Sequence, residues 1–236
     1  MKLPRLFFVL ALLGLGLIAA TASVPAQDKE EGFVSLFNGT DLTGWRYGKK
    51  AGGENKSGKG YQVENGILFC TKSDGGNLFT EKEFADFIFR FEVKIEENGN
   101  NGVGIRAPLE GDAAYVGMEI QVLDDYGPQY KSKLKPWQYH GSIYGVVPVK
   151  PGFLKPAGEW NTEEIYAKGR QIKITLNGTV VVDANLDDVK DEEILKSHRD
   201  LKKPEGSNGI ANAKGHIGFL GHGARVEFRN LRIKEL

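Results

Sequence analysis

Apolar and polar residues alternate along most of the chain after residue 32, in short runs that glycine and asparagine turns separate about every ten residues. The alternation is strongest from Phe87 to Ile95, where the odd-numbered residues are apolar and Arg90, Glu92 and Lys94 lie between them. Such a segment is a strand with one face for the core and one for water. The pattern as a whole predicts an all-β sandwich or barrel.

The predicted strands cover residues 33–37, 61–63, 67–71, 77–80, 84–95, 102–107, 115–123, 140–147, 163–167, 171–176, 179–184, 215–222 and 224–233. Two pairs of neighbouring strands are joined by Asn65-Gly66 and by Asn177-Gly178, which favour a two-residue hairpin loop. These loops fix which neighbours in the sequence pair with each other.

Two features interrupt the regular pattern. In the last strand the apolar parity changes between Phe228 and Leu231, which predicts a bulge near Arg229 and Asn230. Residues 187–203 begin with acidic residues and end with lysines before Pro204, which is typical of a short surface helix or helical loop. The chain has no internal repeat or long linker, so residues 27–236 are expected to form one domain.

The segment from Tyr115 to Asp125 carries the most informative pattern. Even-numbered residues from Val116 to Val122 are apolar, whereas Glu119 and Gln121 fall on the opposite face of a strand. A lone carboxylate beside an amide, near Tyr115 and a small glycine, indicates the floor of a groove. An ordinary strand facing solvent is the alternative interpretation.

Several other strands offer polar side chains to the same sheet face. If the apolar parities face the core, that face can hold a set of five side chains: Arg106, Glu119, Gln121, Tyr144 and His222. Gly102 and Gly104 would leave room there for a ligand. Each residue also has a simpler explanation, because Arg106 could form a surface ion pair and His222 could be a turn residue.

Three further residues could border the groove. Either Asp124 or Asp125 is expected to cap the turn that follows, and the other to line the groove mouth. Trp137 could stack on a sugar ring, although a buried aromatic is the common alternative. His140 shares the groove parity with Ser142 and Tyr144, but a structural histidine is the favoured interpretation.

The first 26 residues have the parts of a secretory signal: Lys2 and Arg5, an apolar run over residues 6–20, and small residues before Gln27. The apolar run is shorter than the ~20 residues that a spanning helix needs. We therefore expect a secreted or periplasmic protein with no membrane span after signal cleavage, with an uncleaved anchor as the alternative.

The 236 residues are 40% hydrophobic and 26% charged, with a formal net charge of zero, which gives no electrostatic reason to expect a nucleic-acid partner. Cys70 is the only cysteine, so no disulfide forms within the chain, and its apolar surroundings predict burial. No nucleotide-binding or nucleophile-elbow motif occurs, and the histidines have no metal-site spacing.

The order of several short motifs resembles the family once called domain of unknown function 1080 and now named for 3-keto-disaccharide hydrolases. The motifs are Leu36-Phe37-Asn38-Gly39, Asp41-Leu42-Thr43-Gly44-Trp45, Gly102-Val103-Gly104-Ile105-Arg106, Glu119-Ile120-Gln121-Val122-Leu123-Asp124, Gly141-Ser142-Ile143-Tyr144, Gly158-Glu159-Trp160-Asn161, Gly215-His216-Ile217-Gly218, His222-Gly223 and Phe228-Arg229-Asn230. The similarity covers nearly all of the chain after the signal. Leu220 departs from it, because the family often has glutamine there.

The resemblance implies a concanavalin A-like jelly-roll sandwich that acts on a small carbohydrate whose C3 hydroxyl a separate sugar 3-oxidoreductase has oxidised. It implies that Glu119 removes the C2 hydrogen, that Arg106 with Gln121 stabilises the enolate, and that His222 or Tyr144 protonates the leaving oxygen. The acid and base could also be exchanged. If a divalent metal is needed, as in some related lyases, Glu119, Asp124 and His222 are the implied ligands.

Two other functions are compatible with the sequence. A non-catalytic, lectin-like carbohydrate-binding module of the same fold would use the same polar side chains for sugar hydroxyls. A conventional glycosidase needs two carboxylates beside one bond, whereas the central strand has Gln121 where the second acid would be expected.

Overall fold

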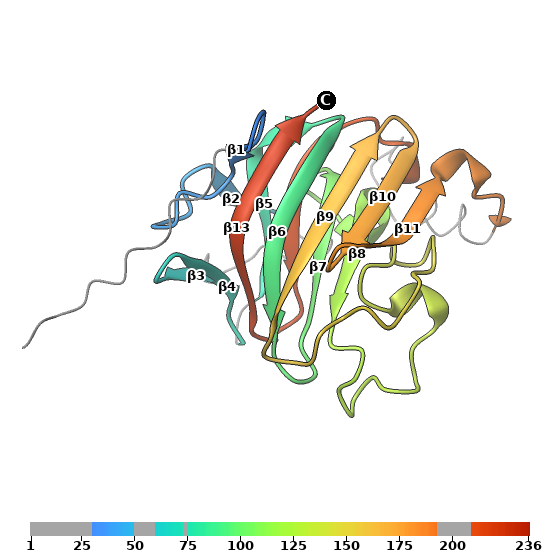
Figure 1. Cartoon of the computed structure of the whole chain (residues 1–236). Coiled ribbons are helices and arrows are strands. Elements are labelled where there is room, and N and C mark those ends of the chain that lie inside the picture. The colour runs from blue at the N-terminus through green and yellow to red at the C-terminus, as the bar shows by residue number, and fades with distance from the viewer. Residues whose placement is uncertain (1–29, 50–59, 73–74, 193–208) are drawn as a thin grey trace, which may run out of the picture. The chain divides into compact units, whose positions relative to one another are not determined.

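Two antiparallel β-sheets make up the part of the chain that the computed structural model describes, namely residues 30–49, 60–72, 75–192 and 209–236 (Figure 1). The larger sheet has the order β11-β10-β9-β6-β13-β4-β3, with β1 paired to β13, and the smaller has the order β2-β5-β12-β7-β8. Residues Glu31–Leu236 form one compact unit. The predicted all-β jelly-roll sandwich is confirmed.

The eight-stranded sheet contains β1 (Val34–Ser35), β3 (Tyr61–Glu64), β4 (Ile67–Cys70), β6 (Phe87–Ile95), β9 (Trp160–Lys168), β10 (Gln171–Leu176), β11 (Thr179–Asn185) and β13 (Val226–Glu235). The five-stranded sheet contains β2 (Trp45–Tyr47), β5 (Gly76–Phe84), β7 (Asn100–Ala107), β8 (Met118–Leu123) and β12 (Gly215–Gly221). Helical structure is short: α1 (Ala113–Val116), η1 (Pro136–Gln138), η2 (Leu186–Asp188) and η3 (Gly209–Ala211).

The core lies between the two sheets because each sheet turns its apolar parity inward. The odd-numbered residues of β6 are buried, as the alternation predicted. Phe219 on β12 stacks on Phe228 on β13 with ring centroids 3.9 Å apart, so the two sheets are in direct contact. Phe219 also stacks on Trp45 at 5.5 Å. Such aromatic pairs add to the stabilisation that burial of their surface provides.

Local turn chemistry explains several of these elements. Asn65 and Gly66 have positive φ angles of 52° and 77°, as do Asn177 and Gly178 at 49° and 81°, so both predicted hairpins are confirmed. The bulge near Asn230 is also confirmed, because the pairing of β13 with β6 shifts between Arg229 and Arg232.

Three predicted strands differ from the observed elements. Residues 84–95 are not one strand: Phe84 ends β5 in the smaller sheet and Phe87 begins β6 in the larger sheet. Tyr115 lies in α1, whose N-cap is Asp112, so the central strand begins only at Met118. Residues 140–147 form turns with isolated bridges at Ile143 instead of a strand.

Two predictions fall partly or wholly outside the described residues. The signal sequence over residues 1–26 lies outside them, as do residues 193–203 of the helical insertion predicted at 187–203. The described part of that insertion includes the end of the single turn η2. Among the residues that the structure does describe, no helix is long and apolar enough to cross a membrane.

Candidate functional site

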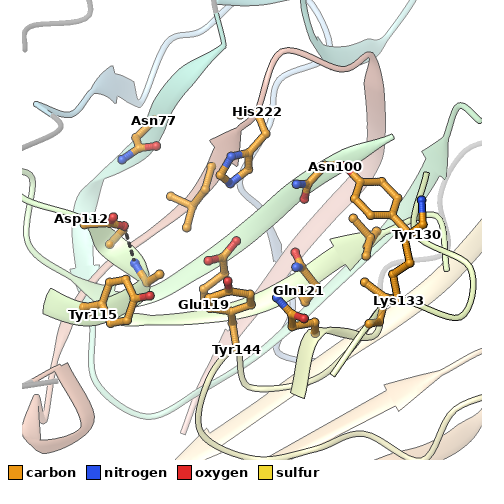
Figure 2. Close-up of a pocket in the computed structure, with 17 residues that line it drawn as sticks. Asn77, Asn100, Asp112, Tyr115, Glu119, Gln121, Tyr130, Lys133, Tyr144 and His222 are labelled. Carbon is orange, nitrogen blue, oxygen red and sulfur yellow. Dashed lines mark hydrogen bonds between the residues drawn. The ribbon is translucent and has the colours of Figure 1, made fainter. Parts of the chain in front are cut away.

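A cavity of about 350 Å³ lies over the smaller sheet, beside the edge strand β8 (Figure 2). Strand residues, α1 and the loop after β8 all contribute to its lining, which consists of Asn77, Asn100, Asp112, Ala113, Ala114, Tyr115, Glu119, Gln121, Leu123, Tyr130, Lys133, Leu134, Gln138, Tyr144, Leu220, Gly221 and His222. Its volume is in the lower part of the range for small-molecule sites, about 300–1,000 Å³.

Glu119 and Gln121 lie in the cavity because the period of a strand turns both toward the same face. Glu119 is only 4% exposed and Gln121 only 5% exposed. Gln121 Oε1 accepts a hydrogen bond from the N–H of Val122 at 3.1 Å, which orients the amide group. The groove floor predicted from the central strand is therefore made of these two side chains.

The outer edge of β8 is covered by the segment that follows η1. The N–H of Tyr144 donates to the carbonyl of Glu119 at 2.8 Å, and the N–H of Gly141 donates to the carbonyl of Gln121 at 2.8 Å. The backbone N–H of Gln121 in turn donates to the carbonyl of Ser142 at 3.0 Å. These bonds fix Tyr144 level with Glu119, although the segment is not a regular strand.

His222, Tyr144 and Tyr115 surround Glu119 (Figure 2). Burial raises the pKa of Tyr115, and the neighbouring Tyr144, Asp112 and Glu119 raise it further. Tyr115 therefore stays protonated near neutral pH and can donate a hydrogen bond. His222 follows the end of β12 and is exposed to solvent. The site thus combines a buried carboxylate with nearby groups that can donate protons.

The cavity has two dissimilar ends along β8. Figure 2 shows Asp112 and Tyr115 on one side of Glu119, with Tyr130 and Lys133 on the other. The first end is walled by α1, where Ala113 and Ala114 are buried. The second end is formed by the loop after β8, whose Lys133 is exposed. The end at α1 consequently carries a carboxylate, and the end at the loop carries an exposed cation.

The structure corrects the predicted position of Arg106, because its side chain does not reach this cavity. Its backbone has a positive φ of 48°, and the pairing of β12 is irregular beside it, so the alternation of β7 ends there. The guanidinium group donates to the carbonyls of Ala85 (3.0 Å) and Gly169 (2.7 Å) and to Asp86 Oδ1 (3.2 Å). It therefore joins the β5–β6 and β9–β10 turns.

Asp124 and Trp137 also lie outside the cavity lining. Both oxygens of Asp124 accept backbone N–H groups, from Asn98 at 2.9 Å and from Tyr126 at 3.2 Å. Asp124 is thus the turn-capping residue of the acidic pair. The Trp137 side chain is exposed, and the cation of Lys135 lies 5.6 Å from its ring centroid.

His140 was also predicted to border the groove, but the structure places it in the buried interior. It is 2% exposed, and its Nε2 lies 3.0 Å from Glu163 Oε2. The simpler explanation of a structural histidine fits this environment.

The predicted room above the glycines of β7 is occupied by the protein itself. The Glu119 side chain lies over Gly102, and a Cβ at Gly104 would approach Leu220 and Phe79. Leu220, which departs from the family pattern, is buried and gives the cavity an apolar wall.

The proposed metal ligands are not brought together. Glu119 and His222 share the cavity, but Asp124 lies outside its lining and is bound to backbone N–H groups. Among the residues that the structure describes, no three histidine, cysteine, aspartate or glutamate side chains are grouped for a metal ion. The predicted ligand set therefore does not fit a metal.

Sequence reasoning missed most of the two ends of the cavity. Asn77, Asn100, Asp112, Tyr130, Lys133 and Gln138 line it without having been proposed. Only Asp112 carries a local signal, because it precedes Ala113 and Ala114 as a helix N-cap. The others come from separate loops and strands, whose meeting depends on sheet order.

The comparisons with known proteins agree on one family. The model of the 3-keto-alpha-glucoside-1,2-lyase-like domain matches residues 32–234. A 3-keto-disaccharide hydrolase from Bacteroides thetaiotaomicron is 28% identical over 87% of this chain and 79% of its own length.

Two solved structures from Parabacteroides distasonis, both provisionally described as glycosyl hydrolases, share the fold. One has a TM-score of 0.68 and 29% identity over 87% of this chain and 94% of that chain. The other has a TM-score of 0.69 and 24% identity over 86% of this chain and 99% of that chain. The resemblance inferred from the motifs is confirmed, and the chain belongs to the family of 3-keto-alpha-glucoside-1,2-lyase-like domains.

Proposed function

We propose that this protein is an enzyme that cleaves the glycosidic bond of 3-keto-glycosides by elimination followed by hydration. The observation that carries the proposal is the position of Glu119, a buried carboxylate in a sugar-sized cavity with Tyr144 and His222 around it. The family match and the curated 3-keto-disaccharide hydrolase support the same substrate class.

The chemistry follows from the ketone at C3, which acidifies the hydrogen on C2. Glu119 accepts that hydrogen as a proton, and the C2–H electrons form the enolate across C2 and C3. The enolate then expels the glycosidic oxygen from C1, and this oxygen takes a proton from His222 or Tyr144. Water adds across the resulting double bond, so the products are the free 3-keto sugar and the leaving alcohol.

The remaining groups in the cavity have supporting roles in this proposal. The amide of Gln121 can donate to the oxygen that becomes negative in the enolate, as fixed donors do in oxyanion sites. We assign the end beside Asp112 and Tyr115, which lies against α1, to the constant keto-sugar ring. The end where Lys133 is exposed suits a leaving group that varies between substrates.

The cellular context is part of the same proposal. A 3-keto-glycoside must be supplied by a sugar 3-oxidoreductase, because nothing in the proposed mechanism oxidises C3. We also propose export to the periplasm or the medium, on the basis of the signal-like residues 1–26.

The test uses a 3-keto-disaccharide and its unoxidised parent, each incubated with the purified protein in deuterated buffer, with and without a chelator. Mass spectrometry follows cleavage and deuterium uptake at C2. We expect cleavage of the keto sugar alone, with exchange at C2. Cleavage of the parent would instead support a conventional glycosidase, and saturable binding without any turnover would support a carbohydrate-binding module.

A further inference from the structure

His140 and Glu163 form a buried polar pair that connects the two sheets. Their side chains are 0% exposed, and His140 Nε2 lies 3.0 Å from Glu163 Oε2. Glu163 lies on β9 of the eight-stranded sheet. His140 belongs to the segment that covers the edge of β8 in the five-stranded sheet. The contact therefore links a strand of one sheet to the segment that covers the edge of the other sheet.

The other atoms of His140 are held by the end of β8. The N–H of Leu123 donates to His140 Nδ1 at 3.2 Å, and the N–H of His140 donates to Asp125 Oδ1 at 2.9 Å. Because Nδ1 accepts a hydrogen bond, the hydrogen of the neutral ring is on Nε2, which donates to Glu163. The ring is thus fixed from both sides.

Stability alone does not account for such a pair. Removing charged groups from water is costly, and apolar residues of similar volume often stabilise a core as well as or better than a buried pair. Glu163 Oε1 also has no hydrogen-bond partner among the described residues. Unlike an apolar contact, the hydrogen bond between His140 and Glu163 is directional, so it fixes residue 140 in one position.

That position determines the geometry of the cavity. The backbone N–H of the next residue, Gly141, donates to the carbonyl of Gln121, and the backbone N–H of Tyr144 donates to the carbonyl of Glu119, both at 2.8 Å. We propose that His140 and Glu163 are positioning residues, an inter-sheet tether that holds Tyr144 against Glu119. The catalytic consequence rests on the proposed function, but the positional consequence does not.

The test compares Glu163→Met, which removes the acceptor, with Glu163→Gln, whose amide oxygen can still accept from Nε2. Asn161→Ala is the matched control, because Asn161 is also buried on β9 and its Oδ1 accepts from Lys155 and Asn177, away from the cavity. Hydrogen exchange followed by mass spectrometry reports on residues 139–147, with β10 as the internal reference.

We expect Glu163→Met to speed exchange over residues 139–147 by about tenfold or more. It should lower kcat on a 3-keto-disaccharide by about 10- to 100-fold, with a smaller change in KM, because misplacement by an ångström is costly to catalysis. Glu163→Gln should keep both the exchange rate over residues 139–147 and kcat close to their wild-type values. Asn161→Ala should lower Tm but leave exchange at 139–147 and kcat near their wild-type values.

Two results would overturn the proposed tether. One is a wild-type rate of hydrogen exchange over residues 139–147 in Glu163→Met, and the other is an equal increase of that rate in Asn161→Ala. If Glu163→Met does not fold, the double variant His140→Met/Glu163→Met replaces the pair by an apolar contact and is read in the same way. Failure of the wild-type protein to cleave any 3-keto-glycoside would overturn the proposed function, whereas the exchange measurement would still decide the tether.

Discussion

The side chain of Glu119 lies directly over Gly102. A Cβ atom at position 102 would be 2.0 Å from Glu119 Oε1 and 2.6 Å from its Cδ. Glu119 pairs with Gly104 in the register of β7 and β8, so its carboxylate reaches diagonally toward the next residue on the same face. The glycine at 102 therefore gives space to the proposed base and not to the substrate.

Gly102→Ala is expected to displace Glu119 and to lower kcat on a 3-keto-disaccharide by about 100-fold, because the reacting groups lose their alignment. The clash is with the end of a flexible side chain, so Tm should change little. Steady-state kinetics and thermal unfolding measure the two effects.

Gly104→Ala is the matched control for this substitution. A Cβ there would meet Leu220 and Phe79 at 3.4 Å, which is an ordinary van der Waals distance. We expect activity within a few-fold of wild type. If both alanine variants lost activity equally, the close approach of Glu119 to Gly102 would not be what matters.

Glu119→Gln keeps the shape of the side chain and removes the base. Loss of general base catalysis should lower kcat by about 10²- to 10⁴-fold and abolish deuterium uptake at C2. Kinetics and mass spectrometry on the same samples check both. Full turnover in this variant would rule out Glu119 as the base.

Asp112→Asn makes the same chemical change at the α1 end of the same cavity. Asp112 Oδ1 accepts the N–H of Ala114 at 3.4 Å as the cap of α1, and an asparagine oxygen can do the same. We expect cleavage of the keto sugar to continue at a similar rate. An equally severe loss in both variants would indicate a mechanism with two carboxylates.

Arg106→Met tests the structural role that replaces the predicted catalytic one. Removal of the buried guanidinium leaves the carbonyls of Ala85 and Gly169 without their donor, which should cost about 2–4 kcal/mol of unfolding free energy. Urea denaturation measures the loss, and kcat of the folded enzyme should stay within about twofold.

Arg229→Met provides the comparison on the surface of the other sheet. Arg229 pairs with Glu92 at 2.7 Å with 39% of its side chain exposed, so we expect a loss below about 1 kcal/mol. A collapse of kcat in Arg106→Met without loss of stability would return Arg106 to the catalytic site.

Cys70 should be unreactive in the folded protein. The residue is buried, and burial raises the pKa of its thiol from 9.0 to about 11. Because the thiolate is the reactive form, a disulfide-exchange reagent at pH 8 should modify it slowly in native protein and rapidly in denaturant. The raised pKa favours the folded state below pH 9, and this contribution is lost as the pH rises toward 11. Fast native labelling at pH 8 would contradict this prediction.

The sequence determined the fold class and the floor of the site by itself. Alternation with a period of two is a local property, so it identified the buried face of β6 and placed Glu119 and Gln121 together. Turn chemistry is also local, which is why both Asn-Gly hairpins were predictable. The order of the short motifs indicated the family, and the comparisons confirm that family.

Only the tertiary structure decided which other residues meet those two. The parity argument failed at Arg106, where a positive φ and an irregular pairing turn the side chain toward the β5–β6 and β9–β10 turns. It also failed at His140, whose partner Glu163 lies on the opposite sheet. Strand order and the path of long loops depend on contacts between distant residues, and a periodic pattern in one segment does not specify them.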